Sequence, residues 1–237
     1  MRKIGILEVV LSAILRLGVI YLFVAMFWSL YDQTGSAWVL QAKHLNLNFM
    51  GIHWLPAQVQ AINPILILVY IPIFAYGVYP AINKVFPLTP LRKISIGFFV
   101  TAISFAIPAF IENWIAAGET PSVAWQLFAY AVITAAEVMV SITCLEFSYT
   151  QAPKKMKSLI MAIFLCSVSL GNVFTARVNA FIENADGTSK LSGANYYWFF
   201  AGLMFVTAVV FIAFARMYKG KQYIQGSEEE VIVGAEN

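Results

Sequence analysis

Long apolar runs, broken at charged, proline-rich or glycine-rich points, dominate the hydrophobic pattern of this chain. Six of these runs reach the roughly 20 residues that an α-helix needs to cross the hydrocarbon core of a bilayer. They span residues 17–42, 56–83, 91–117, 122–150, 157–182 and 196–218. Stretches such as PILILVYIPIFAYGVY are apolar on every face, whereas strands of a membrane β-barrel alternate apolar and polar positions. The pattern therefore predicts an all-α membrane protein with six transmembrane helices.

Composition strengthens this prediction. Of the 237 residues, 60% are hydrophobic and only 11% are charged, and the mean hydropathy is +0.76. A soluble domain carries roughly 25% charged residues, so the lipid bilayer is the expected surroundings of this chain. Its two cysteines both fall inside expected spans and have no metal-ligand spacing, so we predict neither a disulfide framework nor a metal site.

The distribution of Lys and Arg predicts the orientation. With six spans, one side of the membrane holds all the basic residues except Lys43, Arg177 and Lys190. The positive-inside rule makes that side cytoplasmic, so both termini are expected in the cytoplasm of a multi-pass cell-membrane protein. Residues 1–16 are then a cytoplasmic or interfacial lead-in, and residues 219–237 a disordered cytoplasmic tail. The net charge of +3 is a topology signal, and we expect no nucleic-acid partner.

Two acids lie inside the expected spans. Glu137 is roughly 21 Å along the fourth span, counted from Val123, which is close to the bilayer midplane. A charged carboxylate there costs at least about 2.5 kcal/mol, so it should face a cavity, pair with a cation or take up a proton. Ser141 follows at i+4 and could extend a polar strip on the same helical face. A protonated Glu137 bonded to a neighbouring helix is the alternative interpretation.

The first and second spans carry further polar positions. Asp32 lies in the outer half of the first span, four residues after Trp28, and its partner must come from another helix or chain. Trp28 could line a site with Asp32 or belong to an interfacial aromatic belt. In the second span, Gln60 and Asn63 share a helical face just before Pro64, which disturbs the helix and frees polar groups.

Three segments, taken together, resemble a known family. The stretches FWSLYDQTGSAW, QAINPILILVYIPIF and AAEVMVSITCLEFSYTQAPKKMKSLIMAIFLCSVSLGNVF resemble, in order and spacing, helices seven, eight, ten and eleven of the proton-dependent oligopeptide transporter (POT) family. That family belongs to the major facilitator superfamily, whose members have twelve helices in two six-helix halves. The resemblance implies the C-terminal half of such a transporter.

The resemblance also implies roles for individual residues. Trp28 and Tyr31 would be walls of a peptide pocket, with Phe164 at a position where family members often have Trp. Asn63, with Gln60 nearby, would contact the peptide backbone or amino terminus. Glu137 would meet the peptide amino group, with Ser141 one turn below it. Asp32 would form an outer-gate salt bridge to a basic residue of the first half.

The implied function is proton-coupled symport of di- and tripeptides, with the proton as coupling ion and no other cofactor. No Lys or Arg lies deep in any span and the family's acidic proton-coupling motif is absent, so this chain should need an N-terminal six-helix half as partner. Two alternatives remain: a six-helix protein that pairs with itself or with a separately encoded half, and a non-transporting fragment or scaffold with a vestigial pocket. The sequence contains no nucleophile-base pair and no phosphate loop, so we do not expect an enzyme. His44 and His53 are isolated residues in an expected loop.

Overall fold

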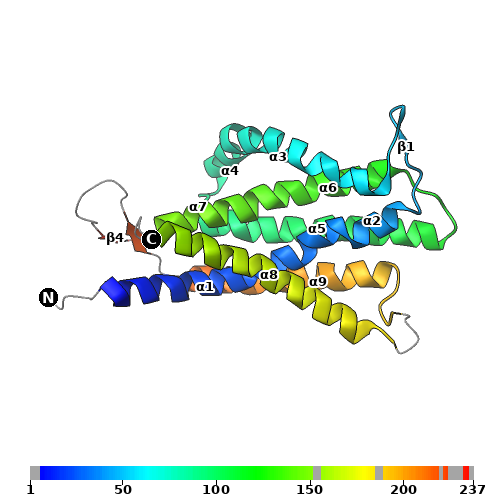
Figure 1. The fold of residues 1–237 in the computed structure, drawn as a ribbon. Helices are drawn as coiled ribbons and strands as arrows, with labels where there is room; N and C mark the ends of the chain where they lie inside the picture. Colours follow the sequence, from blue (N-terminus) through cyan, green and yellow to red (C-terminus); the bar gives the residue numbers. More distant parts are fainter. Residues whose placement is uncertain (1–5, 152–155, 185–188, 219–220, 224–231, 235–237) are drawn as a thin grey trace.

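The computed structural model describes residues 6–151, 156–184, 189–218, 221–223 and 232–234. Six helices in this part of the chain are long and apolar enough to cross a membrane, which confirms the predicted all-α fold. These spans are Ile14–Ala42, Pro56–Val85, Pro90–Ala116, Val123–Thr150, Lys157–Ile182 and Ala194–Met217. The spans run lengthwise side by side as one bundle (Figure 1).

Only the third, fifth and sixth spans are single uninterrupted α-helices: α5 (Pro90–Ala116), α8 (Lys157–Ile182) and α9 (Ala194–Met217). The first span consists of α1 (Ile6–Tyr31), the 3₁₀-helix η1 (Asp32–Gly35) and α2 (Ala37–Ala42). The fourth consists of α6 (Val123–Glu137), the π-helical turn η4 (Val138–Ile142) and α7 (Thr143–Thr150). π-Helical turns inside α-helices occur frequently at functional sites, and η4 begins directly after Glu137.

The second span has the most breaks. It begins as the 3₁₀-helix η2 (Pro56–Ala61), continues as α3 (Ile62–Ile73), widens into the π-helical η3 (Phe74–Val78) and ends as α4 (Tyr79–Val85). Asn63 and Pro64 lie in the first turn of α3, where proline needs no backbone donor. The break expected at this pair is thus the change from 3₁₀ to α geometry, and Pro72 precedes the π turn further on.

Short polar caps begin two of the spans. The Thr89 hydroxyl accepts a hydrogen bond from the backbone N–H of Arg92, and Pro90 occupies the first position of α5. Ser122 similarly accepts from the backbone N–H of Ala124 and begins α6. Both caps satisfy donors that a helix N-terminus leaves free.

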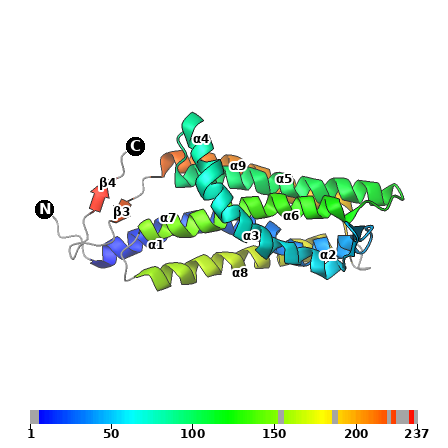
Figure 2. The same cartoon turned by 90° about the horizontal axis from the view of Figure 1, so that it is seen from above.

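The third span forms the centre of the bundle. α5 packs most extensively against α9 and α6, and α1 packs along α8. The third span is 61% buried over its most apolar window, whereas the second span is only 6% buried. Figure 2 shows α3 and α4 crossing the outside of the bundle at an angle to α6 and α7. Most residues of the second span are therefore exposed or only partly buried in this six-helix unit.

The two ends of the bundle differ. α1 begins and α9 ends at one end, and the hairpin of β1 (Asn48–Phe49) and β2 (Ile52–His53) lies at the other (Figure 1). Beyond α9, where the sequence predicts disorder, β3 (Lys221–Tyr223) pairs antiparallel with β4 (Ile232–Gly234). At the other terminus, α1 is helical from Ile6 and continues into the first span without a break at residue 16.

Candidate functional site

A hydrogen-bonded network joins the first, second and fourth spans near the middle of the bundle. Tyr31, the last residue of α1, donates from its hydroxyl to Oδ1 of Asn63 at 3.1 Å. The Asn63 side-chain nitrogen donates to the Thr134 hydroxyl at 2.9 Å and to Oε2 of Glu137 at 3.0 Å. The Thr134 hydroxyl in turn donates to the carbonyl of Tyr130 at 2.7 Å, which leaves its oxygen free to accept from Asn63. One amide thus fixes three spans relative to one another.

Glu137 is the acidic residue of this network, and it has no ion-pair partner among the described residues. Its hydrogen-bond partner Asn63 is neutral, and no described Lys, Arg or His forms an ion pair with it. Its side chain is only half-buried, so the carboxylate is both anchored and reachable. A fixed acid of this kind, without a countercharge in its own bundle, is suited to a cationic guest or to a proton.

Aromatic rings form a wall beside the network. Trp28 meets Tyr31 edge-on with ring centroids 5.3 Å apart, and it meets Phe164 of α8 edge-on at 6.3 Å. Phe164 also packs edge-on against Tyr21 at 5.8 Å. The Trp28 indole nitrogen is buried and has no hydrogen-bond acceptor among the described residues. Trp28 therefore contributes the surface of its ring to this wall, because its indole N–H is covered by neighbouring residues.

Asp32 lies at the start of η1, outside this network. Its Oδ2 accepts a 2.6 Å hydrogen bond from the side-chain nitrogen of Asn172 on α8. The neighbouring Gly171 lies so close to α1 that a Cβ would collide with the carbonyl oxygen of Ala25, and the Thr175 hydroxyl donates to the carbonyl of Ser29 at 2.9 Å. These contacts fix the register of α8 on α1 and hold Asn172 against Asp32.

The remaining expected site residues lie at the edges of the network. Gln60 is exposed on η2, where its side-chain amide lies against Gly35. Ser141 lies in η4, the π-helical turn that begins directly after Glu137. The structure therefore brings together Tyr31, Asn63 and Glu137, whereas a binding role for each residue stays a prediction.

Two features of this site were not expected from the sequence. The π turn at η4 has no proline or glycine that would mark it, so nothing in the residue pattern distinguishes it from an ordinary helix. Asn172 could not be identified from the sequence as the partner of Asp32, because the two residues are 140 positions apart in the chain. Among the described residues, no group of three His, Cys, Asp or Glu could hold a metal ion.

Comparison with known families adds to this geometry. The model of a family described as "PTR2: POT family" matches residues 10–199, which is most of the chain. The chain belongs to the POT family. This confirms the resemblance seen in the sequence segments that carry Asp32, Asn63 and Glu137.

Individual proteins that are similar to this POT-family chain are peptide transporters. Peptide transporter PTR2 of Saccharomyces cerevisiae is 30% identical over 200 residues, which are 78% of this chain and 32% of the yeast protein. Peptide transporter 3 of Caenorhabditis elegans is 44% identical over 99 residues, 42% of this chain and 14% of that protein. The chain thus spans about a third or less of the length of these relatives.

Solved structures of the family show the same fold. The crystal structure of an auto-inhibited POT family peptide transporter superposes with a TM-score of 0.84 at 32% identity, covering 91% of this chain and 43% of that one. The POT family transporter PepTSo superposes with a TM-score of 0.79 at 36% identity, covering 87% of this chain and 42% of PepTSo. The six helices therefore correspond to less than half of each solved transporter.

Proposed function

We propose that this chain provides the C-terminal six-helix half of a proton-coupled symporter of di- and tripeptides. The observation that carries the proposal is the bridge from Tyr31 through Asn63 to Glu137, which holds an uncompensated acid beside an aromatic wall. The peptide-transporter relatives support peptides as the substrate class. We infer an orientation with both termini in the cytoplasm from the distribution of Lys and Arg.

In this proposal the peptide ammonium binds at Glu137. The charged carboxylate attracts it, and Asn63 holds one carboxylate oxygen so that the acid keeps a fixed position. The peptide lies against the aromatic wall, with the Trp28 ring beside its backbone and with Phe164 bounding the space for a side chain. Charge-assisted hydrogen bonds of this kind are roughly twice as strong as neutral ones, so Glu137 accounts for much of the affinity.

Glu137 also offers a way to couple transport to protons. When the carboxylate takes up a proton it becomes neutral and loses its attraction for the ammonium. A proton taken up from the outer side by another acid of the complete transporter, and passed to Glu137 once the site faces the cytoplasm, therefore helps to release the peptide. The proton and the peptide then both leave to the cytoplasm. No cofactor other than the proton is needed.

Alternating access requires two bundles that rock about one site. The second half of the site, which would hold the peptide carboxylate and a cation for Asp32, is expected from an N-terminal six-helix bundle on the same polypeptide or on a separate chain. The largely unburied second span and the exposed face of α8 are surfaces on which such a bundle could rest.

The test is uptake of a labelled dipeptide into liposomes under an inward proton gradient. The chain is reconstituted alone, and also together with the N-terminal half of a POT transporter. Uptake that appears only in the mixture, and that disappears when a protonophore is added, supports the proposal. No uptake in either preparation favours a fragment or scaffold without transport, and proton-driven uptake by this chain alone contradicts the need for a second half.

A further inference from the structure

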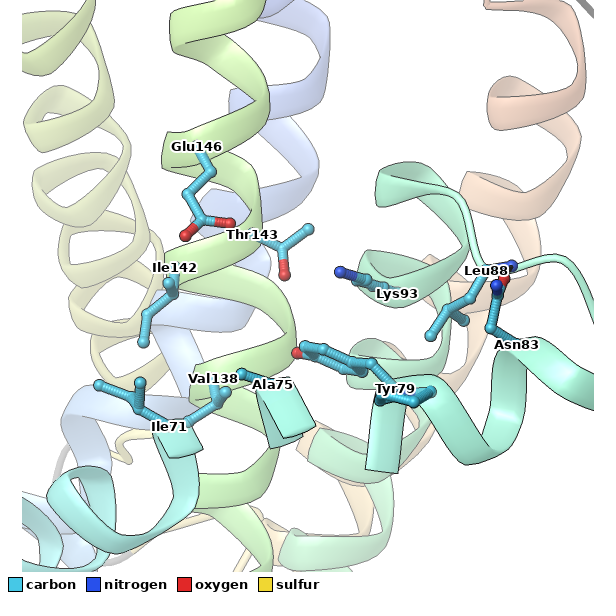
Figure 3. A pocket seen from close by; sticks show the side chains of 11 residues that line it. Ile71, Ala75, Tyr79, Asn83, Leu88, Lys93, Val138, Ile142, Thr143 and Glu146 are labelled. Atoms are coloured by element: carbon cyan, nitrogen blue, oxygen red, sulfur yellow. Dashed lines mark hydrogen bonds between the residues drawn. The ribbon is translucent and has the colours of Figure 1, made fainter. Parts of the chain in front are cut away.

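A cavity lies toward the end of the bundle where α1 begins and α9 ends. It has a volume of about 530 Å³, is open to the outside of the bundle and is bounded by the second span, the start of α5, and η4 with α7. Figure 3 shows the labelled side chains from these elements around the space. Val138 lies at one edge of the cavity, but Glu137, Asn63 and Tyr31 do not line it, and Glu146 on its wall is nine residues beyond Glu137 along the fourth span.

Opposite charges line different walls of this cavity. Lys93 approaches from α5, and its ammonium lies 4.0 Å from the centroid of the Tyr79 ring. Glu146 extends from α7 on another side of the space (Figure 3). Glu146 is exposed and Lys93 is half-buried. The two charges form no ion pair with each other or with other residues in the part of the chain that the structure describes.

The cavity also has hydroxyl groups and an apolar floor. The Tyr79 hydroxyl is buried and interacts with the side chain of Thr143, which lines the same cavity. Ile71, Ala75, Val138 and Ile142 supply apolar surface around these polar groups. Small-molecule sites combine a few placed polar groups with such surface, in volumes of roughly 300–1,000 Å³.

We propose that this cavity is a binding site for a small zwitterion, with its ammonium at Glu146 and its anionic group at Lys93. The Tyr79 ring lies against the Lys93 ammonium and helps to position it, and the apolar floor accommodates a side chain or alkyl group. Free amino acids and short peptides with unblocked ends have this chemistry, and so does a phosphoethanolamine headgroup. Because Glu146 and Lys93 are opposite in sign and lie apart, a dipolar ligand satisfies both, whereas a simple anion or cation satisfies one.

This proposal goes beyond the proposed transport and does not depend on it, because it concerns binding to this bundle alone. It also gives a role to Glu146, which the transport proposal leaves unused.

Alkylation of a cysteine placed in the cavity wall tests the proposal. Ala75→Cys is introduced together with Cys166→Ala, since Cys166 is exposed and Cys144 is buried. The rate of maleimide modification is measured in lipid-free detergent with increasing dialanine. We expect saturable protection that slows modification at least about fivefold. Dialanine with an acetylated amino end or an amidated carboxyl end should protect much less, because each lacks one of the two charges.

Charge-neutralising variants locate the protected site. Lys93→Gln and Glu146→Gln should each abolish protection, whereas the exposed controls Lys84→Gln and Glu119→Gln should retain it. Glu137→Gln should also retain it. Protection that disappears in Glu137→Gln but persists in Lys93→Gln and Glu146→Gln would overturn the proposal, since it would reflect a conformational change caused at the first site. Gel filtration and circular dichroism confirm that each variant is folded.

A second arm separates the two sources of this chemistry. The same protection assay is run with lysophosphatidylethanolamine in place of dialanine, and with lysophosphatidylglycerol, which lacks the ammonium, as control. Protection by dialanine identifies a free amino-carboxylate ligand, and protection by the ethanolamine lipid alone identifies a headgroup site. Either result supports a zwitterion site. Absence of protection by both ligands would overturn the proposal.

Discussion

The side-chain amide of Asn63 donates to Glu137 at 3.0 Å across the boundary between the second and fourth spans. The same nitrogen also donates to the Thr134 hydroxyl. Because few residues of the second span are buried in this bundle, these two hydrogen bonds are important polar contacts between α3 and α6. The arrangement leaves the acid fixed in position but without a countercharge. A movement of α3 would therefore change the environment of the carboxylate. A change of charge at Glu137 would in turn change the strength of its hydrogen bond to Asn63 on α3.

Glu137→Gln separates the charge of this residue from its hydrogen bonding. The glutamine carbonyl still accepts from Asn63, so the fold should be unchanged, but the attraction for a peptide ammonium is lost. A hydrogen bond to a charged group contributes about 1.5–3 kcal/mol, which corresponds to a loss of about tenfold or more in peptide affinity. Dipeptide uptake in the two-half liposomes measures the loss.

The matched control for that variant is Glu119→Gln, an exposed residue beyond the end of α5. It should leave uptake within about twofold of the unaltered protein. Equal losses in both variants would exclude a specific role for Glu137 in binding.

Asn172→Asp places a second carboxylate against Asp32. The present contact is 2.6 Å from the Asn172 nitrogen to Asp32 Oδ2, so the substitution replaces a donor by a like charge. We expect the seam between α1 and α8 to open locally and the melting temperature in detergent to fall, more at pH 8 than at pH 5, because protonation of either acid relieves the repulsion. Asn195→Asp, an exposed position at the start of α9, should show no such pH dependence.

The outer-gate role of Asp32 needs a separate experiment. If Asp32 pairs with a cation of the N-terminal half, Asp32→Lys should abolish uptake, and reversal of that cation to an acid should restore part of it. Asp32→Asn keeps a partner for Asn172 and should be folded, so the loss of uptake there would come from the charge. Failure of every charge reversal to rescue Asp32→Lys would contradict the gate.

Much of the fold could be predicted from the sequence, for a physical reason. The cost of exposing polar backbone to lipid requires long helices, so six apolar runs determine the number of spans without knowledge of their packing. Less of the candidate site could be predicted from the sequence. Helical spacing identified Asn63 and Glu137 as polar positions, but only the folded bundle shows that one amide bridges Tyr31 and Glu137.

The other site residues show what residue spacing leaves open. Spacing puts Gln60 on the same helical face as Asn63, and the structure shows in addition that the Gln60 amide lies against Gly35. Ser141 follows Glu137 at i+4, and the π turn that contains it leaves no mark in the residue pattern. Asp32 was expected to have a partner on another helix or chain, and Asn172 of α8 is a partner within this bundle. In each case the missing information is a local change of helix type or a contact distant in sequence.

Phe164→Ala tests the aromatic wall. Phe164 is only 5% exposed and packs against Trp28 and Tyr21, so its removal leaves a void. Truncation of a buried phenylalanine costs about 3–5 kcal/mol in soluble cores, so the melting temperature should fall clearly. The enlarged space should also raise the uptake of dipeptides with bulky side chains relative to dialanine. Phe128→Ala, at a position 54% exposed on α6, is the control and should change neither quantity.

Gly171 and Gly202 form a matched pair that tests the packing of α8 on α1. A Cβ at Gly171 would meet the backbone of Ala25 and Ser29, neither of which can move aside without shifting the helix, whereas a Cβ at Gly202 of α9 meets nothing within 4 Å. Gly171→Ala should therefore destabilise the bundle by about 1–3 kcal/mol, the usual cost of overpacking. Gly202→Ala should be neutral or stabilising by up to about 1 kcal/mol, because alanine is the better helix former. Thermal unfolding in one detergent measures both. The close packing at Gly171 holds Asn172 against Asp32, so Gly171→Ala should also reduce peptide uptake if Asp32 forms the outer gate. An unaltered melting temperature of Gly171→Ala would show that α8 does not pack on α1 as closely as described.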